Sequence, residues 1–202
     1  MSDMSALELD ALQEIFNVGV GRAAASLSQL TNETISMSVP VIHMLSPQGA
    51  SEFLDPHHDR ILTCISQTFS GSFSGNALLI FPSVNSLEIV RLMLGSEMPL
   101  EQLSEVEQDA MCEIGNIILN ACFSTIGGML SEHFCCQLPI LKAGYITDIL
   151  NQTSPNKQVL IVQIQMGLEK HNIEGFLAFL LENQSEECLH QAIKQFLTKV
   201  EA

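Results

Sequence analysis

An internal repeat restricts the folds open to this chain more than any other feature of the sequence. Residues 9–41 and 108–140 align without an insertion at an offset of 99 positions. Identical residues recur in that register, among them Asp10, Ala11, Glu14, Ile15, Asn17 and Pro40, which return as Asp109, Ala110, Glu113, Ile114, Asn116 and Pro139. The repeat predicts two copies of one folding unit of about a hundred residues each.

Hydrophobic periodicity predicts the same order of elements in both copies. In the first copy we expect helix 5–31, strand 33–44, strands 60–70 and 73–81, and helix 83–94. In the second copy we expect helix 104–132, strand 135–145, strands 158–168 and 173–181, and helix 185–200. Because the strands do not alternate strictly with helices, the pattern indicates an α+β fold and not a doubly wound parallel sheet.

One unit of three strands and two helices is too small to bury a stable core alone. We therefore expect the two copies, about residues 1–100 and 101–202, to share one core within a single domain that spans residues 1–202. The expected fold is α+β, built of tandem helix–strand–hairpin–helix units related by pseudo-two-fold symmetry.

The composition argues against several classes of partner. The chain has 8 Lys and Arg against 23 Asp and Glu, a formal net charge of −15, and such a surface repels phosphate backbones and anionic lipid headgroups. We expect no nucleic-acid partner. We also expect no membrane insertion, because no apolar run approaches the roughly 18 residues that span a bilayer. The N-terminal segment lacks a signal pattern, which favours a cytoplasmic protein.

Cysteine and histidine spacing gives no metal motif. The six cysteines include no Cys-x-x-Cys pair, which indicates reduced thiols. His57, His58, Asp59 and Cys64 could be drawn as a metal cluster, but their spacing fits no standard site. We expect this chain to hold no metal and no cofactor of its own.

Three polar residues in each copy share one side of the first predicted helix. They are spaced i, i+4 and i+7, as Asp10, Glu14 and Asn17 and again as Asp109, Glu113 and Asn116. The apolar residues form the opposite stripe, so we expect the polar side to face solvent. An asparagine inside a helix costs up to roughly 0.7 kcal/mol relative to alanine. Its repetition indicates a task for the amide, although solvated residues retained after duplication are the plainer interpretation.

Familiar catalytic arrangements fit these residues poorly. No histidine or nucleophile recurs between the copies, which argues against a Ser-His-Asp or Cys-His site. Paired carboxylates of the glycosidase type need a cleft, which a convex helix does not provide. A carboxylate and a carboxamide on an exposed ridge suit a different task, which is to reach into the site of another protein.

The pattern Asp-x3-Glu-x2-Asn-x22-Pro occurs in both copies and resembles the signature of the CheC/CheX/FliY family of chemotaxis phosphatases. Two copies, each within a helix–strand–hairpin–helix unit, match the CheC type over nearly the whole chain. The resemblance implies an enzyme that dephosphorylates the aspartyl phosphate of a CheY-like receiver domain in two-component signalling. It also implies a CheD-like deamidase as a further partner.

The resemblance also implies a role for each repeated residue. Asn17 and Asn116 would orient the attacking water, and Glu14 and Glu113 would pair with the active-site lysine of the partner. The Mg²⁺ ion would belong to the partner receiver domain. These roles agree with phosphoryl transfer, in which positioning and electrostatics dominate.

Two other functions stay open at this point. A non-catalytic chemotaxis or flagellar-switch adaptor would keep the binding face without turnover, and a small-molecule enzyme would need a pocket between the halves. The first copy also departs from the family pattern, because Phe16 replaces a small residue such as Gly115 and Arg22 adds a cation. Phe16 either obstructs the partner or packs into the core, and the apolar stripe favours the core.

Overall fold

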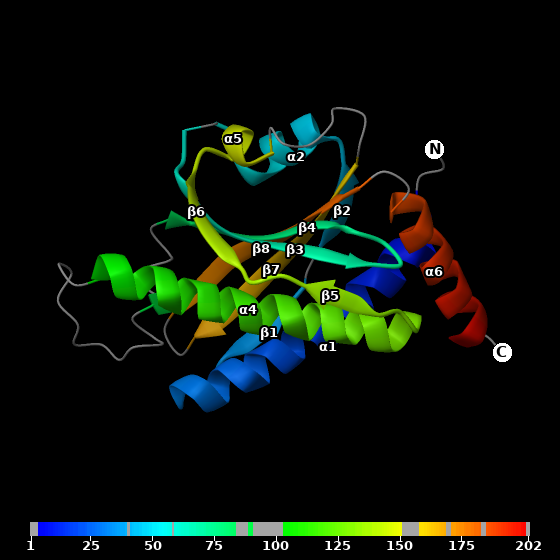
Figure 1. Ribbon diagram of the computed structural model, residues 1–202, viewed down its shortest axis with the longest axis horizontal. Helices are drawn as coiled ribbons and strands as arrows, with labels where there is room; N and C mark the ends of the chain where they lie inside the picture. Colours follow the sequence, from blue (N-terminus) through cyan, green and yellow to red (C-terminus); the bar gives the residue numbers. More distant parts are fainter. Residues whose placement is uncertain are drawn as a thin grey trace.

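A single antiparallel sheet with helices on both faces organises the molecule (Figure 1). The computed structural model describes residues 4–39, 41–57, 59–83, 89–90, 103–150, 158–168, 171–182 and 185–200. Its strands are β1 (Ser36–Ser38), β2 (Ile42–Leu45), β3 (Leu62–Gly71), β4 (Gly75–Pro82), β5 (Phe134–Cys136), β6 (Ile140–Gly144), β7 (Val159–Leu168) and β8 (His171–Leu181). The helices are α1 (Ala6–Thr31), α2 (Pro47–Leu54), α4 (Leu103–Leu130), α5 (Ile146–Leu150) and α6 (Ser185–Val200). The expected α+β class is confirmed.

The two halves of the chain exchange strands within the sheet. The strand order is β1-β7-β8-β4-β3-β5, with β2 also paired to β7 and β6 also paired to β3. The opening strands of each half therefore pair with the hairpin of the other half. Ile42 lies opposite Val162, and Leu141 lies opposite Ile65. The halves meet where β4 pairs with β8, so neither half contains a complete sheet.

Successive side chains along each strand point to opposite faces of the sheet, so they pack into two separate cores. The larger core lies under α1 and α4 and includes Ile65, Phe69 and Phe179. The smaller core lies under α2 and α5 on the opposite face and includes Cys64 and Ile80. In Figure 1, α2 and α5 lie above the sheet and α1 and α4 below it. The molecule is thus three layers deep, with the sheet in the middle.

The long apolar helix α4 belongs to the larger core. By length and composition, its stretch Gln108–Leu130 could cross a membrane, so the expectation that no such run exists was wrong. Of the most apolar window in this stretch, 56% is buried inside the molecule, as in the core helix of a soluble protein. α4 lies beside α1 and packs on the sheet, which accounts for its hydropathy.

Most of the predicted elements are confirmed, with two differences. Each strand predicted before a hairpin is divided into two, β1 and β2 in the first half and β5 and β6 in the second. In the second half, the division contains Pro139, a residue with no N–H to donate to a neighbouring strand. Pro40 lies outside the described residues. The short helices α2 and α5 were not predicted, although Ser46 followed by Pro47 is a recognisable helix start. Most of the predicted helix 83–94 lies outside the described residues, and Ile89 and Val90 within it are buried.

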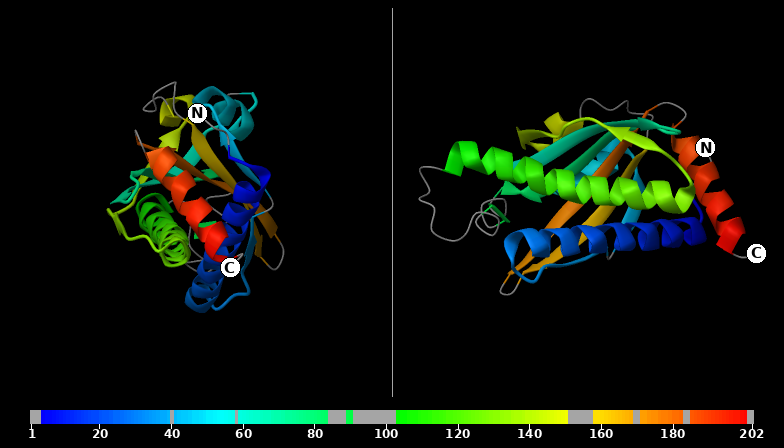
Figure 2. Two further views of the ribbon diagram at one scale, coloured as in Figure 1. Left: turned by 90° about the vertical axis from the view of Figure 1, so that its right-hand side faces the viewer. Right: turned by 60° about the horizontal axis from the view of Figure 1, so that its bottom comes forward.

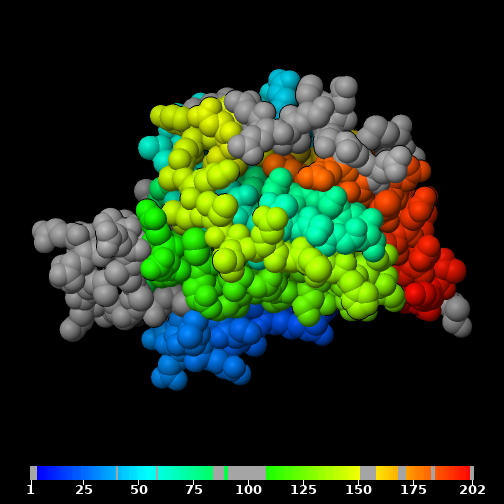
Figure 3. Space-filling view, in the orientation of Figure 1, coloured from blue at the N-terminus to red at the C-terminus, as the bar shows by residue number. Residues whose placement is uncertain are grey.

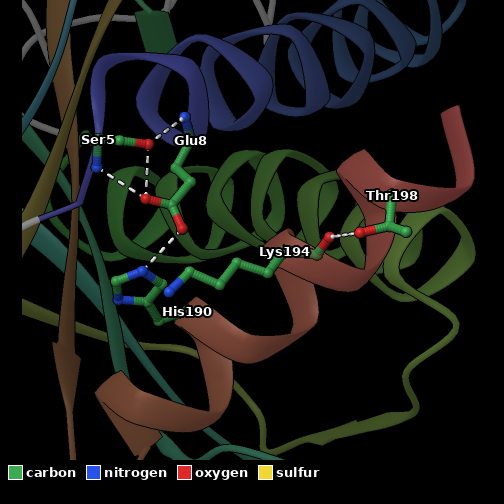
Figure 4. A network of polar contacts seen from close by, with 5 residues as sticks. All are labelled: Ser5, Glu8, His190, Lys194 and Thr198. Atoms are coloured by element: carbon green, nitrogen blue, oxygen red, sulfur yellow. Dashed lines mark hydrogen bonds and ion pairs between the residues drawn. The ribbon is translucent and has the colours of Figure 1, made fainter. Parts of the chain in front are cut away.

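The C-terminal helix α6 is anchored to the start of α1 through Glu8 (Figure 4). Ser5 and Glu8 form a reciprocal capping box, in which the Ser5 backbone N–H and hydroxyl each donate to Glu8 Oε2 over 2.7 Å. The other carboxylate oxygen, Oε1, lies 2.7 Å from Nε2 of His190 on α6. Burial alone would raise the pKa of Glu8, but the Ser5 hydrogen bonds and the charges of His190 and Lys194 outweigh it and lower the pKa.

We expect Glu8→Gln to lower the free energy of unfolding at pH 7 by roughly 1–3 kcal/mol, because it removes a buried charged acceptor. The lowered pKa of Glu8 means that its stabilisation is present above the unfolded-state value of 4.5 and is lost as the pH falls further. Urea titrations at pH 7, 5 and 3.5 should therefore give a smaller acid-induced loss of stability in the variant. Glu187→Gln, at an exposed position on α6, is the control. Equal acid sensitivity in wild type and Glu8→Gln would contradict this role.

Candidate functional site

The repeated polar residues lie on the outer sides of α1 and α4. Glu14 and Glu113 are exposed, as are Asp10 and Asp109, whereas Asn17 and Asn116 are half-buried. The opposite side of each helix carries residues with almost no exposure, such as Ile15 on α1 and Ile114 on α4. The sheet takes up the apolar side of both helices, so the Glu–Asn pairs face solvent as the periodicity predicts.

The two motif helices lie side by side and run in opposite directions (Figure 2). They approach closely at Gly19, where a Cβ atom would lie 3.1 Å from the Cα of Cys122. Arg22 turns toward α4, and its guanidinium donates a hydrogen bond to the buried Thr125 hydroxyl over 3.2 Å. Arg22, the positively charged residue expected near the first site, therefore links α1 and α4. Figure 3 shows α4 in green, exposed between α1 in blue and the yellow-green segment of β5 and β6.

Asn17 is hydrogen-bonded to the segment that carries the motif proline. Its Oδ1 atom accepts from the Val39 backbone N–H over 2.8 Å, and Gln13 Nε2 donates to the Val39 carbonyl over 3.0 Å. Pro40, which follows Val39, has no N–H to offer. In the first copy, the asparagine thus holds the residue directly before the proline against α1.

Asn116 is held differently in the second copy. Its Oδ1 atom accepts from Nδ2 of Asn120, one turn further along α4, over 2.7 Å. Leu138, the counterpart of Val39, is 85% exposed, whereas Val39 is 2% exposed. Cys112 replaces Gln13, and burial raises the pKa of its thiol more than the Leu141 backbone lowers it. Asn120 was not predicted, although its i, i+4 spacing from Asn116 was a usable signal.

The bulky residue beside the first asparagine does not obstruct it. Phe16 is 1% exposed, and its ring centre lies 5.3 Å from that of Phe179 in the larger core. The interpretation of Phe16 as a core residue is confirmed. Its counterpart Gly115 is small for a different reason, since a Cβ atom there would lie 2.5 Å from Ile65 Cγ2. Neither residue covers its neighbouring Glu–Asn pair.

The described side chains form no obvious metal or nucleophile site. Within the described residues, no three of the His, Cys, Asp and Glu side chains come close enough together to hold a metal ion. His58 lies outside those residues. A pocket of about 320 Å³ opens on the α5 side of the sheet, where Lys142 and Asp148 line it beside Cys64. Burial raises the pKa of the Cys64 thiol to about 12, so this thiol does not supply a nucleophile at neutral pH.

Known proteins resemble this chain in the region of the first motif copy. A model of the CheC-like family matches residues 7–44, which contain Glu14 and Asn17. The CheY-P phosphatase CheC of Bacillus subtilis is 26% identical over 125 residues, which are 60% of this chain and 59% of CheC. The flagellar motor switch phosphatase FliY of B. subtilis is 22% identical over 172 residues, or 84% of this chain and 44% of FliY. The chain thus spans about half the length of these curated relatives.

Solved structures share the fold over nearly all of this chain. The crystal structure of Thermotoga maritima FliY matches with a TM-score of 0.78 and 20% identity, covering 98% of this chain and 99% of that chain. CheX from Borrelia burgdorferi, solved in a complex with CheY, BeF3 and Mg2+, matches with a TM-score of 0.52 and 14% identity, covering 84% of this chain and 97% of that chain. The family-model match, the two curated relatives and this shared fold all support the resemblance of the chain to the CheC/CheX/FliY family.

Proposed function

We propose that the protein hydrolyses the aspartyl phosphate of a CheY-like receiver domain in the cytoplasm. The observation that carries this proposal is the outward presentation of two Glu–Asn pairs, Glu14 with Asn17 on α1 and Glu113 with Asn116 on α4. The activities named for CheC and FliY of B. subtilis support it. A CheD-like deamidase is a further proposed partner.

Each Glu–Asn pair acts by entering the active site of the partner. The asparagine carboxamide holds a water molecule in line with the phosphorus, and the glutamate pairs with the partner's lysine to fix the docking register. The water oxygen forms a new bond to phosphorus while the bond from phosphorus to the aspartyl oxygen breaks. The products are inorganic phosphate and a free aspartate carboxylate. The Mg²⁺ ion that neutralises the developing charge is bound by the receiver domain.

We also propose that the two halves are copies of one unit, related by a two-fold axis within a single domain. The matching strand registers support this proposal. The pair Ile42 with Val162 in one half of the sheet corresponds to the pair Leu141 with Ile65 in the other. This symmetry would give one molecule two sites, one on α1 and one on α4.

Timing of phosphate release from a phosphorylated receiver domain tests the activity. We expect the protein to accelerate release at substoichiometric concentration when Mg²⁺ is present. An adaptor would bind the phosphorylated receiver domain and leave its rate of decay unchanged, which would contradict the phosphatase proposal.

Because each asparagine positions water at its own site, we expect Asn116→Ala to retain roughly half of the turnover and Asn17→Ala/Asn116→Ala almost none. At each site the loss should reach about 10²–10³-fold, the usual effect of removing one positioned group. Asn172→Ala, at an exposed position of β8, is the control. Thermal melts must accompany the kinetics, because Asn17→Ala also removes the hydrogen bond to Val39. Full activity in a folded double variant would overturn the assignment.

We expect Glu113→Gln to weaken docking at the second site, because it deletes a charge that pairs with the partner's lysine. In an Asn17→Ala background, KM for the phosphorylated receiver should rise by about 5- to 30-fold, equivalent to roughly 1–2 kcal/mol. Glu52→Gln, at an exposed position of α2 on the other face of the sheet, serves as the charge-matched control. An unchanged KM in Glu113→Gln would contradict the docking role.

We expect the isolated protein to bind no Mg²⁺ specifically, because the ion belongs to the receiver domain in this mechanism. Calorimetric titration of the protein alone with MgCl₂ should give only dilution heats, whereas activity with the receiver domain should require Mg²⁺. Tight, stoichiometric binding to the isolated chain would instead favour a metalloenzyme.

A further inference from the structure

We propose that Asn120 is a positioning residue, which sets the orientation of the Asn116 carboxamide at the second site. This inference rests on the proposed function and adds to it a residue that does not belong to the repeated motif. Its basis is the hydrogen bond of 2.7 Å from Asn120 Nδ2 to Asn116 Oδ1.

In both copies, the Oδ1 atom of the motif asparagine accepts a hydrogen bond, but the donors differ. At the first site, the Val39 backbone N–H donates to Asn17 Oδ1, which fixes the amide assignment because a backbone N–H is only a donor. At the second site, a side chain on the same helix donates to Asn116 Oδ1. The shared outcome, reached by unrelated groups, indicates that the amide orientation matters.

The difference between the donors follows from the surroundings of each asparagine. Leu138 stands where Val39 stands in the first copy, but its 85% exposure leaves it undocked from the core. The first copy has Gly21 at the position of Asn120, and glycine offers no side-chain donor. Among the described residues, each site therefore has one donor for the amide oxygen, and the second site depends on Asn120 for it.

Fixing Oδ1 in this way determines which group faces the partner. Within the described residues, neither Asn17 nor Asn116 donates a hydrogen bond through Nδ2. The Nδ2 group is therefore free to donate to the attacking water or to a phosphoryl oxygen. Without Asn120, the Asn116 side chain would sample several rotamers and both amide orientations, and only a fraction of them would be productive.

The experiment uses an Asn17→Ala background, in which only the second site turns over. We expect Asn120→Ala to lower kcat by about 3- to 10-fold with little change in KM, because orientation is lost while docking is kept. Asn120→Asp should lower kcat further, since a carboxylate only accepts hydrogen bonds and would turn Nδ2 of Asn116 toward itself. Ser124→Asp adds the same charge one turn further along α4 and should leave kcat close to that of the background.

A spectroscopic measurement separates positioning from a general structural effect. In spectra of the protein with ¹⁵N-labelled asparagine, Asn120→Ala should shift the side-chain amide signals of Asn116, while the melting temperature stays that of the background. Unchanged kcat in both Asn120→Ala and Asn120→Asp would overturn the inference. If Asn116→Ala in the same background also kept its activity, the proposed function itself would fail; if Asn116→Ala abolished it, only the positioning role would fail.

Discussion

The packing of α1 and α4 against one face of the sheet determines where the repeated Glu and Asn side chains lie. Each helix buries one apolar side in the larger core, and this burial turns Glu14 and Glu113 outward. The close approach at Gly19 and the hydrogen bond from Arg22 to Thr125 fix the two helices relative to each other. The Glu–Asn pairs are therefore held on rigid elements and do not depend on a loop to place them.

The two sites differ although their motif is the same. The first is tied to the sheet segment through Val39, whereas the second is tied within its own helix through Asn120. Substitutions in the sheet segment should thus affect the amide of the first site more than that of the second. The outward Glu and Asn side chains are the same in both halves, but the groups that support them differ.

Hydrophobic periodicity was enough to predict the long helices, the hairpin strands and the outward polar side. It could not predict the exchange of opening strands between the halves, because pairings such as Ile42 with Val162 depend on tertiary register. The helix α5 has only five residues, too few for a periodic signal. The repeat made Asn17 and Asn116 candidate site residues, but their hydrogen-bond partners depend on how closely the following segment lies against each helix.

The central claim is that the two carboxamides reach the phosphorylated site of a receiver domain. The most direct measurement follows the side-chain amide signals of Asn17 and Asn116 by NMR as receiver domain is added with and without BeF₃. The account predicts that only the activated receiver shifts these signals, and that backbone signals of α2 and α5 stay unchanged. Shifts confined to α2 and α5, with the two asparagine side chains unaffected, would contradict it.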